Sequence, residues 1–207
     1  SDIIKHAADF YPNWDTDLAG KLLEYFALNP LQSHSGLSKG MQSTFNMIVG
    51  LSSRCSLTVF DEPTTGMDIA KRKDFYRALL KDYVDHPRTV ILSSHLISEV
   101  ENILEDILLI DSGSKRLHLP LTEFKEYALS LRGDAQTIFE LSKDMELIYR
   151  EEFGPNNVYV VVRNNLSETW LQEIKNKGIT VSVVSTEDLC VYLTMKGKGG
   201  IDDVFRR

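Results

Sequence analysis

The sequence predicts an α/β fold in its first part, followed by a small α+β part of the ferredoxin-like type. Two short apolar runs, at 57–60 and 89–93, alternate with amphipathic helical patterns, as expected of a parallel sheet covered by helices. Beyond Pro120 the order becomes strand, helix, strand, strand, helix, strand. The chain has 207 residues, 43% of them hydrophobic and 26% charged, which suits a folded protein of one or two domains. We expect one domain over residues 1–119 and a second over 120–207.

The elements of the first part follow from apolar spacing and from polar capping residues. Asp15 or Thr16, Ser38 and Asp68 each precede an amphipathic stretch, so each is expected to cap a helix. We expect five helices: over 2–10, from 16 until Asn29-Pro30 ends it, one that starts at 39, over 69–84 and over 97–104. We expect strands over 57–60 and 89–93, and a hairpin that pairs 107–110 with 115–119.

The elements of the second part are shorter and separated by turn residues. Gly154-Pro155-Asn156-Asn157 predicts a tight connection between two strands, and Ser167 is expected to cap a helix. We expect strands over 127–132, 146–153, 158–163 and 180–185, and helices over 135–143, after 167 and over 187–195.

Composition and charge argue against several classes of protein. The net charge of -7 disfavours a nucleic-acid partner, because phosphate backbones attract basic surfaces. No apolar run reaches the length of a transmembrane helix. Cys55 and Cys190 match no metal or disulfide spacing, so we expect them to be reduced, buried thiols of a cytosolic protein.

Two adjacent acids, Asp61 and Glu62, end the apolar run that begins at Leu57. Buried acids are costly without partners, and neighbouring strand residues point to opposite sides, so the two carboxylates are expected to have different roles. One can support Mg²⁺ while the other orients a water. His95 follows the second apolar run, at the strand end where ligands bind in open α/β sheets. The alternative is a strand that ends in solvated acids beside a structural histidine.

A possible anion site precedes these acids. Ser38 is a helix cap with Gly40 in the first turn, which leaves backbone N–H groups open at the positive end of a helix. Taken alone, such a cap is usually structural, and Thr64-Thr65-Gly66-Met67-Asp68 alone predicts only a turn and a cap.

Together, four motifs in this order resemble the ABC ATPase family. LSKGMQ resembles its signature, LTVFDEP its Walker B strand, TTGMD its D-loop and SSHL its histidine switch, over residues 1 to about 118. The forms of these motifs are similar to a bacterial exporter-type subgroup, in which an accessory C-terminal domain commonly follows. Lys39 and Met41 depart from the usual LSGGQ, which leaves the role of Gln42 open.

The resemblance implies roles for individual residues. Asp61 would hold Mg²⁺ through water, Glu62 would polarise the attacking water and His95 would contact the γ-phosphate of ATP. Ser38 and Gly40, with Lys39 and Gln42 beside them, would reach a nucleotide across a dimer interface. Asp68 would couple the two nucleotide sites.

The resemblance also implies partners: a membrane permease and a second ATP-binding subunit, with the protein cytoplasmic and peripheral on the inner face of the cell membrane. No nucleic-acid partner is expected. The chain lacks the phosphate-binding pattern G-x-x-x-x-G-K-[ST]. We therefore expect a form truncated at its N-terminus, without the Walker A region, that hydrolyses no ATP alone and binds ATP and Mg²⁺ weakly or not at all.

Two other functions stay open at this point. One is a soluble ABC ATPase that acts on ribosomes or DNA. Its tandem ATPase domains, basic linker or long coiled coil are not seen in the sequence. The other assigns residues after Pro120 to a binding or dimerisation module that regulates the ATPase, although no convergent polar cluster there names a ligand.

Overall fold

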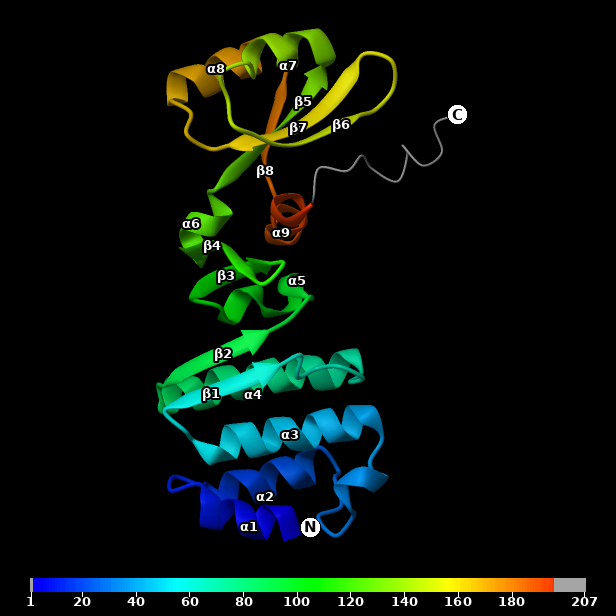
Figure 1. Cartoon of the computed structure of the whole chain (residues 1–207), viewed down its shortest axis with the longest axis vertical. Coiled ribbons are helices and arrows are strands. Elements are labelled where there is room, and N and C mark those ends of the chain that lie inside the picture. The colour runs from blue at the N-terminus through cyan, green and yellow to red at the C-terminus, as the bar shows by residue number, and fades with distance from the viewer. Residues whose placement is uncertain (1, 196–207) are drawn as a thin grey trace. The chain divides into compact units, whose positions relative to one another are not determined.

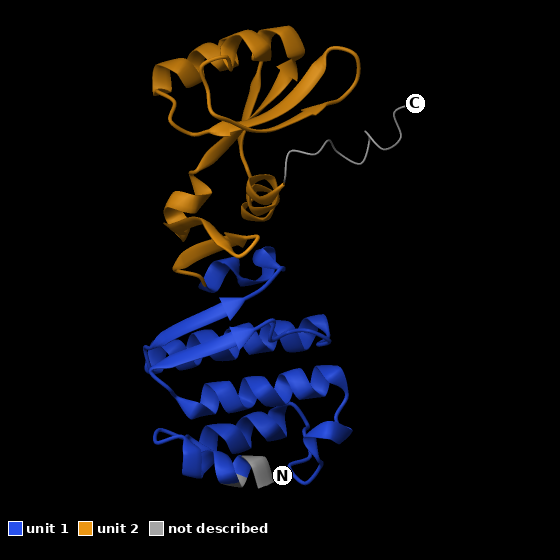
Figure 2. Ribbon diagram, in the orientation of Figure 1, with its two compact units in different colours: residues 1–103 blue, residues 104–207 orange. Residues whose placement is uncertain are grey.

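The computed structural model of the chain describes residues 2–195, except for the side chains of residues 2, 3 and 5. It divides into two compact units, residues 1–103 and 104–207 (Figure 2). The domain boundary expected between residues 119 and 120 does not coincide with this division and stays a prediction. Both units combine helices with sheets, which confirms the predicted mixed α/β fold class. None of the helices within residues 2–195 is long and apolar enough to cross a lipid bilayer.

The first unit consists of helices stacked against a two-stranded parallel sheet (Figure 1). Helix α3 packs against α4 and β1, and the helices α1 and α2 pack against α3. The elements are α1 (Asp2–Phe10), α2 (Thr16–Tyr25), the 3₁₀ turn η1 (His34–Gly36), α3 (Lys39–Ser53), β1 (Leu57–Asp61), α4 (Ile69–Asp85), β2 (Thr89–Ser93), α5 (Ile97–Val100) and the 3₁₀ turn η2 (Glu101–Ile103).

Polar caps start the long helices where the sequence predicts them. The side chains of Asp15, Ser38 and Asp68 each accept a hydrogen bond from the backbone N–H three residues later. Helix α2 ends at Tyr25, earlier than Asn29-Pro30, because Ala27 takes a left-handed conformation with φ of 52°. The predicted helix over 97–104 is one turn of α-helix that continues as 3₁₀.

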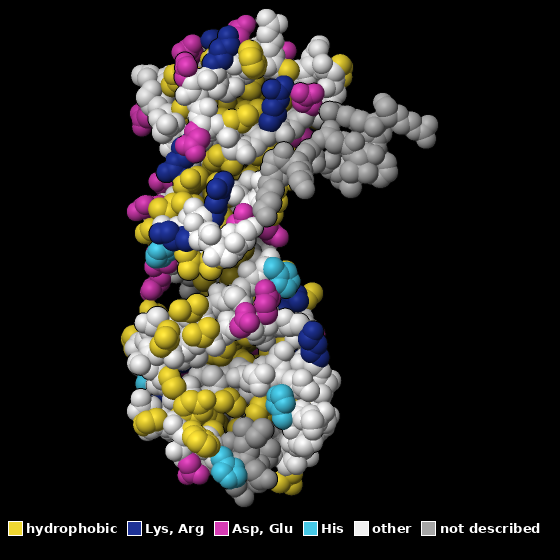
Figure 3. Space-filling view, viewed as in Figure 1, with side chains coloured by type: hydrophobic (Ala, Val, Ile, Leu, Met, Phe, Trp, Pro, Cys, Tyr) yellow, Lys and Arg dark blue, Asp and Glu magenta, His cyan; other side chains and the backbone are white. Residues whose placement is uncertain are grey.

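One face of the small sheet is covered and the other is open. Phe60 is buried and lies edge-on to Phe75 of α4, with ring centroids 5.5 Å apart. On the opposite face Leu57, Val59 and Ile91 are 52%, 61% and 53% exposed. Within residues 2–195, β1 pairs with β2 alone. Figure 3 shows hydrophobic side chains at the surface in the region of these strands.

The second unit has a hairpin and a four-stranded antiparallel sheet in the order β6-β7-β5-β8. That order, with a helix after the first and third strands, is the predicted ferredoxin-like arrangement. The elements are β3 (Asp106–Asp111), β4 (Ser114–Pro120), α6 (Leu121–Lys125), β5 (Ala128–Asp134), α7 (Ala135–Leu141), β6 (Leu147–Glu152), β7 (Asn157–Arg163), α8 (Glu168–Asn176), β8 (Thr180–Val183) and α9 (Thr186–Thr194).

Alternation along β7 divides the core of this unit into two layers. Val158, Val160 and Val162 face a cluster with Ile138 of α7 and Ile174 of α8. On the other face, Val161 packs in a cluster with residues of α9, the hairpin and α6, among them Leu189, Ile107 and Phe124. The short helix α6 was not expected from the sequence. It begins directly after Pro120, which occupies the N-cap position.

Candidate functional site

The predicted acids and histidine come together because β1 and β2 are parallel and in register. Asp61 lies opposite Ser93, so the chain segments that follow both strands leave the sheet at the same edge. Ser93 Oγ donates a hydrogen bond to Asp61 Oδ1 and accepts one from the backbone N–H of Glu62 at 2.8 Å. One hydroxyl therefore orients the first carboxylate and the backbone that carries the second.

Glu62 and His95 are in direct contact. The Nδ1 atom of His95 lies 2.9 Å and 2.8 Å from the two carboxylate oxygens of Glu62. A carboxylate only accepts, so Nδ1–H donates and Nε2 remains for another partner. Their side chains are 71% exposed for His95 and 40% exposed for Glu62, so both are accessible to a ligand. Glu62 has a φ of 44°, a conformation that is uncommon for a non-glycine residue and that concentrates at functional sites.

A cavity of about 570 Å³ opens beside the two acids. Asp61, Glu62 and the strand residues Val59 and Phe60 form one part of its lining, and residues of α3, among them Asn46, form another. Its volume is in the range of sites that hold small ligands. Among residues 2–195, no three histidine, cysteine or acidic side chains cluster as a metal site would require.

The predicted signature residues cluster around the start of α3. Ser38 Oγ accepts a hydrogen bond from Met41 N–H at 3.3 Å, as a helix cap does. The side-chain amide of Gln42 donates to the carbonyl oxygens of Leu37 and His34, at 3.1 and 3.3 Å. Gln42 therefore stabilises the loop before the helix. Lys39 is exposed in the first helical turn.

The turn at residues 64–68 lies directly on this helix start. A Cβ atom at Gly40 would lie 2.2 Å from the carbonyl oxygen of Gly66, so only glycine fits there. Ser43 Oγ donates to the carbonyl oxygen of Thr65 at 2.7 Å. The motifs LSKGMQ and TTGMD are thus in physical contact, although about 25 residues separate them.

Asp68 ends the turn and begins α4. Its carboxylate accepts the backbone N–H of Lys71 at 2.9 Å, and this hydrogen bond lowers the pKa of Asp68 from its ordinary value of 3.8. A hydrogen bond between Thr64 Oγ1 and the hydroxyl of Tyr76, 3.3 Å apart, also stabilises the turn, and Thr64 is buried.

The structure therefore arranges the eight predicted site residues in two groups. Asp61, Glu62 and His95 form the first, and the residues at the two helix starts form the second, namely Ser38, Lys39, Gly40, Gln42 and Asp68. Of the hydrogen bonds and ion pairs described within residues 2–195, none joins a side chain of one group to a side chain of the other. The sequence analysis assigned no role to Ser93. Its place at the end of the second strand, opposite Asp61, could have indicated the hydrogen bond between them.

Comparisons with known proteins identify a similar family model and similar sequences. Residues 22–101 match the family described as "AAA domain, putative AbiEii toxin, Type IV TA system". The chain is 22% identical over 189 residues to the ABC transporter ATP-binding protein YtrB of Bacillus subtilis, covering 87% of this chain and 63% of the relative. It is 26% identical over 183 residues to the Nod factor export ATP-binding protein I of Cupriavidus metallidurans, covering 87% of this chain and 54% of the relative.

A solved structure described as an ATP binding subunit of an ABC transporter superposes with a TM-score of 0.54 at 18% identity, covering 60% of this chain and 53% of that one. This likeness shows a shared fold. The names of the relatives support an ABC ATPase family for the chain. The chain spans between 40% and 63% of the length of the first three relatives it matches.

Proposed function

We propose that the chain forms part of the ATP-hydrolysing subunit of an ABC-type membrane transporter of the exporter type. The observation that carries this proposal is the contact of Glu62 with His95 beside Asp61, at the edge where two parallel strands end. Parallel strands deliver ligand-binding groups to this edge, and a carboxylate paired with a histidine there suits phosphoryl transfer to water.

Each member of the first group has a proposed task. Asp61 is exposed and offers a hard oxygen ligand, which fits Mg²⁺ held by one or two carboxylates and water. Mg²⁺ would supply charge neutralisation at the phosphates. Glu62 orients the attacking water and accepts its proton. His95, held at Nδ1 by Glu62, presents Nε2 to the γ-phosphate.

The second group is proposed to act on the nucleotide of another subunit. The start of α3 offers backbone N–H groups at the positive end of a helix, with the cation Lys39 beside them. Ser38, Gly40 and Gln42 would close this surface over a phosphate of the partner, and Asp68 would link it to the first group through the turn at residues 64–68. The partners are thus a second ATP-binding subunit and a membrane permease, with the protein at the inner face of the cell membrane.

The sequence fits ATP only in part, because it lacks G-x-x-x-x-G-K-[ST], whose backbone and lysine hold the phosphates. The open face of Leu57, Val59 and Ile91 offers a surface on which a polypeptide carrying that loop could pack. We therefore propose that the 207 residues alone do not hydrolyse ATP, since Glu62 can orient water only against a phosphate held in place.

The test is complementation. The chain is co-expressed with the adenine-binding and phosphate-loop half of an ABC ATP-binding subunit, and Mg²⁺-dependent ATP hydrolysis by the complex is measured. We expect no turnover by the chain alone, turnover by the complex, and a loss of about 10²–10⁴-fold with Glu62→Gln. Glu24→Gln, an exposed change on α2, should leave the rate unchanged.

Two outcomes contradict different parts of the proposal. Turnover by the chain alone that Glu62→Gln abolishes would show that the proposed inactivity is wrong while the ATPase function is right. A complex that forms, binds ATP and hydrolyses it equally well with Glu62→Gln would show that the assignment of Glu62 is wrong.

A further inference from the structure

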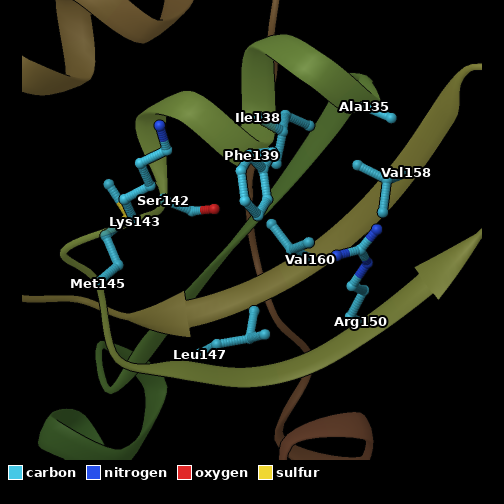
Figure 4. A pocket seen from close by; sticks show the side chains of 10 residues that line it. All are labelled: Ala135, Ile138, Phe139, Ser142, Lys143, Met145, Leu147, Arg150, Val158 and Val160. Atoms are coloured by element: carbon cyan, nitrogen blue, oxygen red, sulfur yellow. The ribbon is translucent and has the colours of Figure 1, made fainter.

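A second cavity lies in the unit formed by residues 104–207, beside the edge strand β6. It has a volume of about 340 Å³ and opens between α7 and the strands β6 and β7 (Figure 4). Its apolar walls include Ile138 and Phe139 of α7, Leu147 of β6, and Val158 and Val160 of β7. Sites for small molecules have such apolar linings and volumes of about 300–1,000 Å³.

A β-bulge creates one wall of this cavity. Leu147 pairs with Val162 but Tyr149 pairs with Val161, so the register shifts between them. The shift places Leu147 on the same face of the sheet as Arg150, which pairs with Val160. Without the bulge, strict alternation would put these two residues on opposite faces. Tyr149 points the other way and stacks on Tyr192, with ring centroids 4.1 Å apart.

The two helices on this face leave the edge strand less covered than its neighbours. Helix α7 packs mainly on β5 and β7, and α8 packs on β8. Phe139 and Leu147 consequently remain 56% and 50% exposed at the cavity. Apolar surface of this kind is unfavourable in water, and its burial by a ligand would be favourable.

Two cations border the same cavity. In Figure 4, Lys143 and Arg150 lie on either side of Phe139, and Lys143 Nζ is 5.4 Å from the centre of the Phe139 ring. Arg150 Nη2 bonds Glu152 Oε1 at 2.9 Å, and the Arg150 side chain is 46% exposed. A guanidinium has five N–H donors, so this ion pair leaves donors available for a second carboxylate. Two cations at one apolar cavity stand out in a chain of net charge -7.

We propose that this cavity binds a small amphipathic carboxylate. The apolar body of the ligand packs against Phe139, Leu147 and Val160. The carboxylate of the ligand accepts hydrogen bonds from Arg150, and Lys143 adds positive potential. Arginine suits this role because its planar fork matches the two oxygens of a carboxylate. Glu152 places a negative charge next to Arg150, so it weakens binding of the anion. The proposal does not depend on ATP hydrolysis by the first unit.

The test is a titration of the ¹⁵N-labelled 207-residue chain, followed by amide chemical shifts, with octanoate, 1-octanol and acetate. We expect saturable shifts with octanoate, confined to α7, β6 and β7, binding at least about tenfold weaker with 1-octanol, and no saturation with acetate. Absence of saturation with octanoate, equal affinity for 1-octanol, or shifts spread over both units would each overturn the proposal.

Charge variants give a second test with opposite signs. Arg150→Met should weaken octanoate binding about tenfold, and Glu152→Gln should tighten it about threefold. Lys143→Met should weaken it about threefold, whereas the matched change Lys175→Met, at an exposed position of α8 outside the lining, should have no effect. Unchanged affinity in both Arg150→Met and Glu152→Gln would show that the carboxylate does not bind at Arg150.

Discussion

Substitution of Gly40 by alanine tests the contact between the two motifs that meet at the start of α3. An added Cβ would lie 2.2 Å from the carbonyl oxygen and 3.0 Å from the carbonyl carbon of Gly66. Both are backbone atoms, so no flexible side chain can move aside. Gly66 itself has a φ of 79°, a conformation that favours glycine, so the turn has little freedom to move.

The expected effect is the difference of two terms. Alanine is favoured over glycine in a helix by about 1 kcal/mol, and less in the first turn. Overpacking costs about 1–3 kcal/mol, and the rigidity of the neighbouring backbone places this site at the upper end. We therefore expect Gly40→Ala to lower the free energy of unfolding of the first unit by about 2 kcal/mol.

Urea denaturation followed by tryptophan fluorescence measures this quantity for the first unit alone. The two tryptophans lie in different units, so Trp170→Phe leaves Trp14 as the reporter of residues 1–103. Gly20→Ala is the matched control. Gly20 is exposed within α2 with no atom within 4 Å of an added Cβ, so the change should stabilise this unit by about 0.5–1 kcal/mol. If the Gly20→Ala protein gains stability as expected and the separate Gly40→Ala protein is as stable as wild type, the reasoning is refuted.

Three further predictions concern single polar groups. Ser93→Ala removes the hydroxyl that bonds Asp61, so urea denaturation should show the first unit destabilised by about 1 kcal/mol; an unchanged midpoint would contradict this role. The Asp68 carboxylate has a lowered pKa, so its stabilisation is complete above its ordinary value of 3.8 and is lost as the pH falls through the folded value. The difference in unfolding free energy between wild type and Asp68→Ala should therefore shrink below about pH 4, and a difference that grows on acidification would show the sign to be wrong. Cys190 is half-buried, and this desolvation raises its pKa from 9.0 to about 11, so at pH 8 its alkylation should be about 100-fold slower in the folded chain than in urea; equal rates would contradict the raised pKa.

Local signals in the sequence predicted the fold well where capping residues and apolar periodicity agree. Ser38, Asp68 and Ser167 begin helices at the expected positions, and the strands over 57–61 and 89–93 follow from short apolar runs. The helix expected over 97–104 is shorter because its second half continues as a 3₁₀ turn, which the apolar spacing does not distinguish from an α-helix.

The proximity of the acids and the histidine could be predicted from the sequence, whereas other contacts of the candidate site could not. Strand ends with acids and a histidine indicated that Asp61, Glu62 and His95 would meet, because parallel neighbours end at one edge. The contact of Gly40 with Gly66 was not predictable, since it depends on how the turn at residues 64–68 folds back on α3. The cavity beside β6 depends on a bulge at Ile148, and no residue there signals a bulge in the way that a glycine would.

Contacts of the first unit link its motifs into one contiguous region. Ser93 joins the two strand ends through Asp61 and the backbone of Glu62, and the turn that follows Glu62 rests on Gly40. We therefore expect a displacement of the α3 start to be transmitted through backbone contacts to Glu62. Coupling of this kind needs contiguous, closely packed groups, and the glycine-only approach at residues 40 and 66 supplies them.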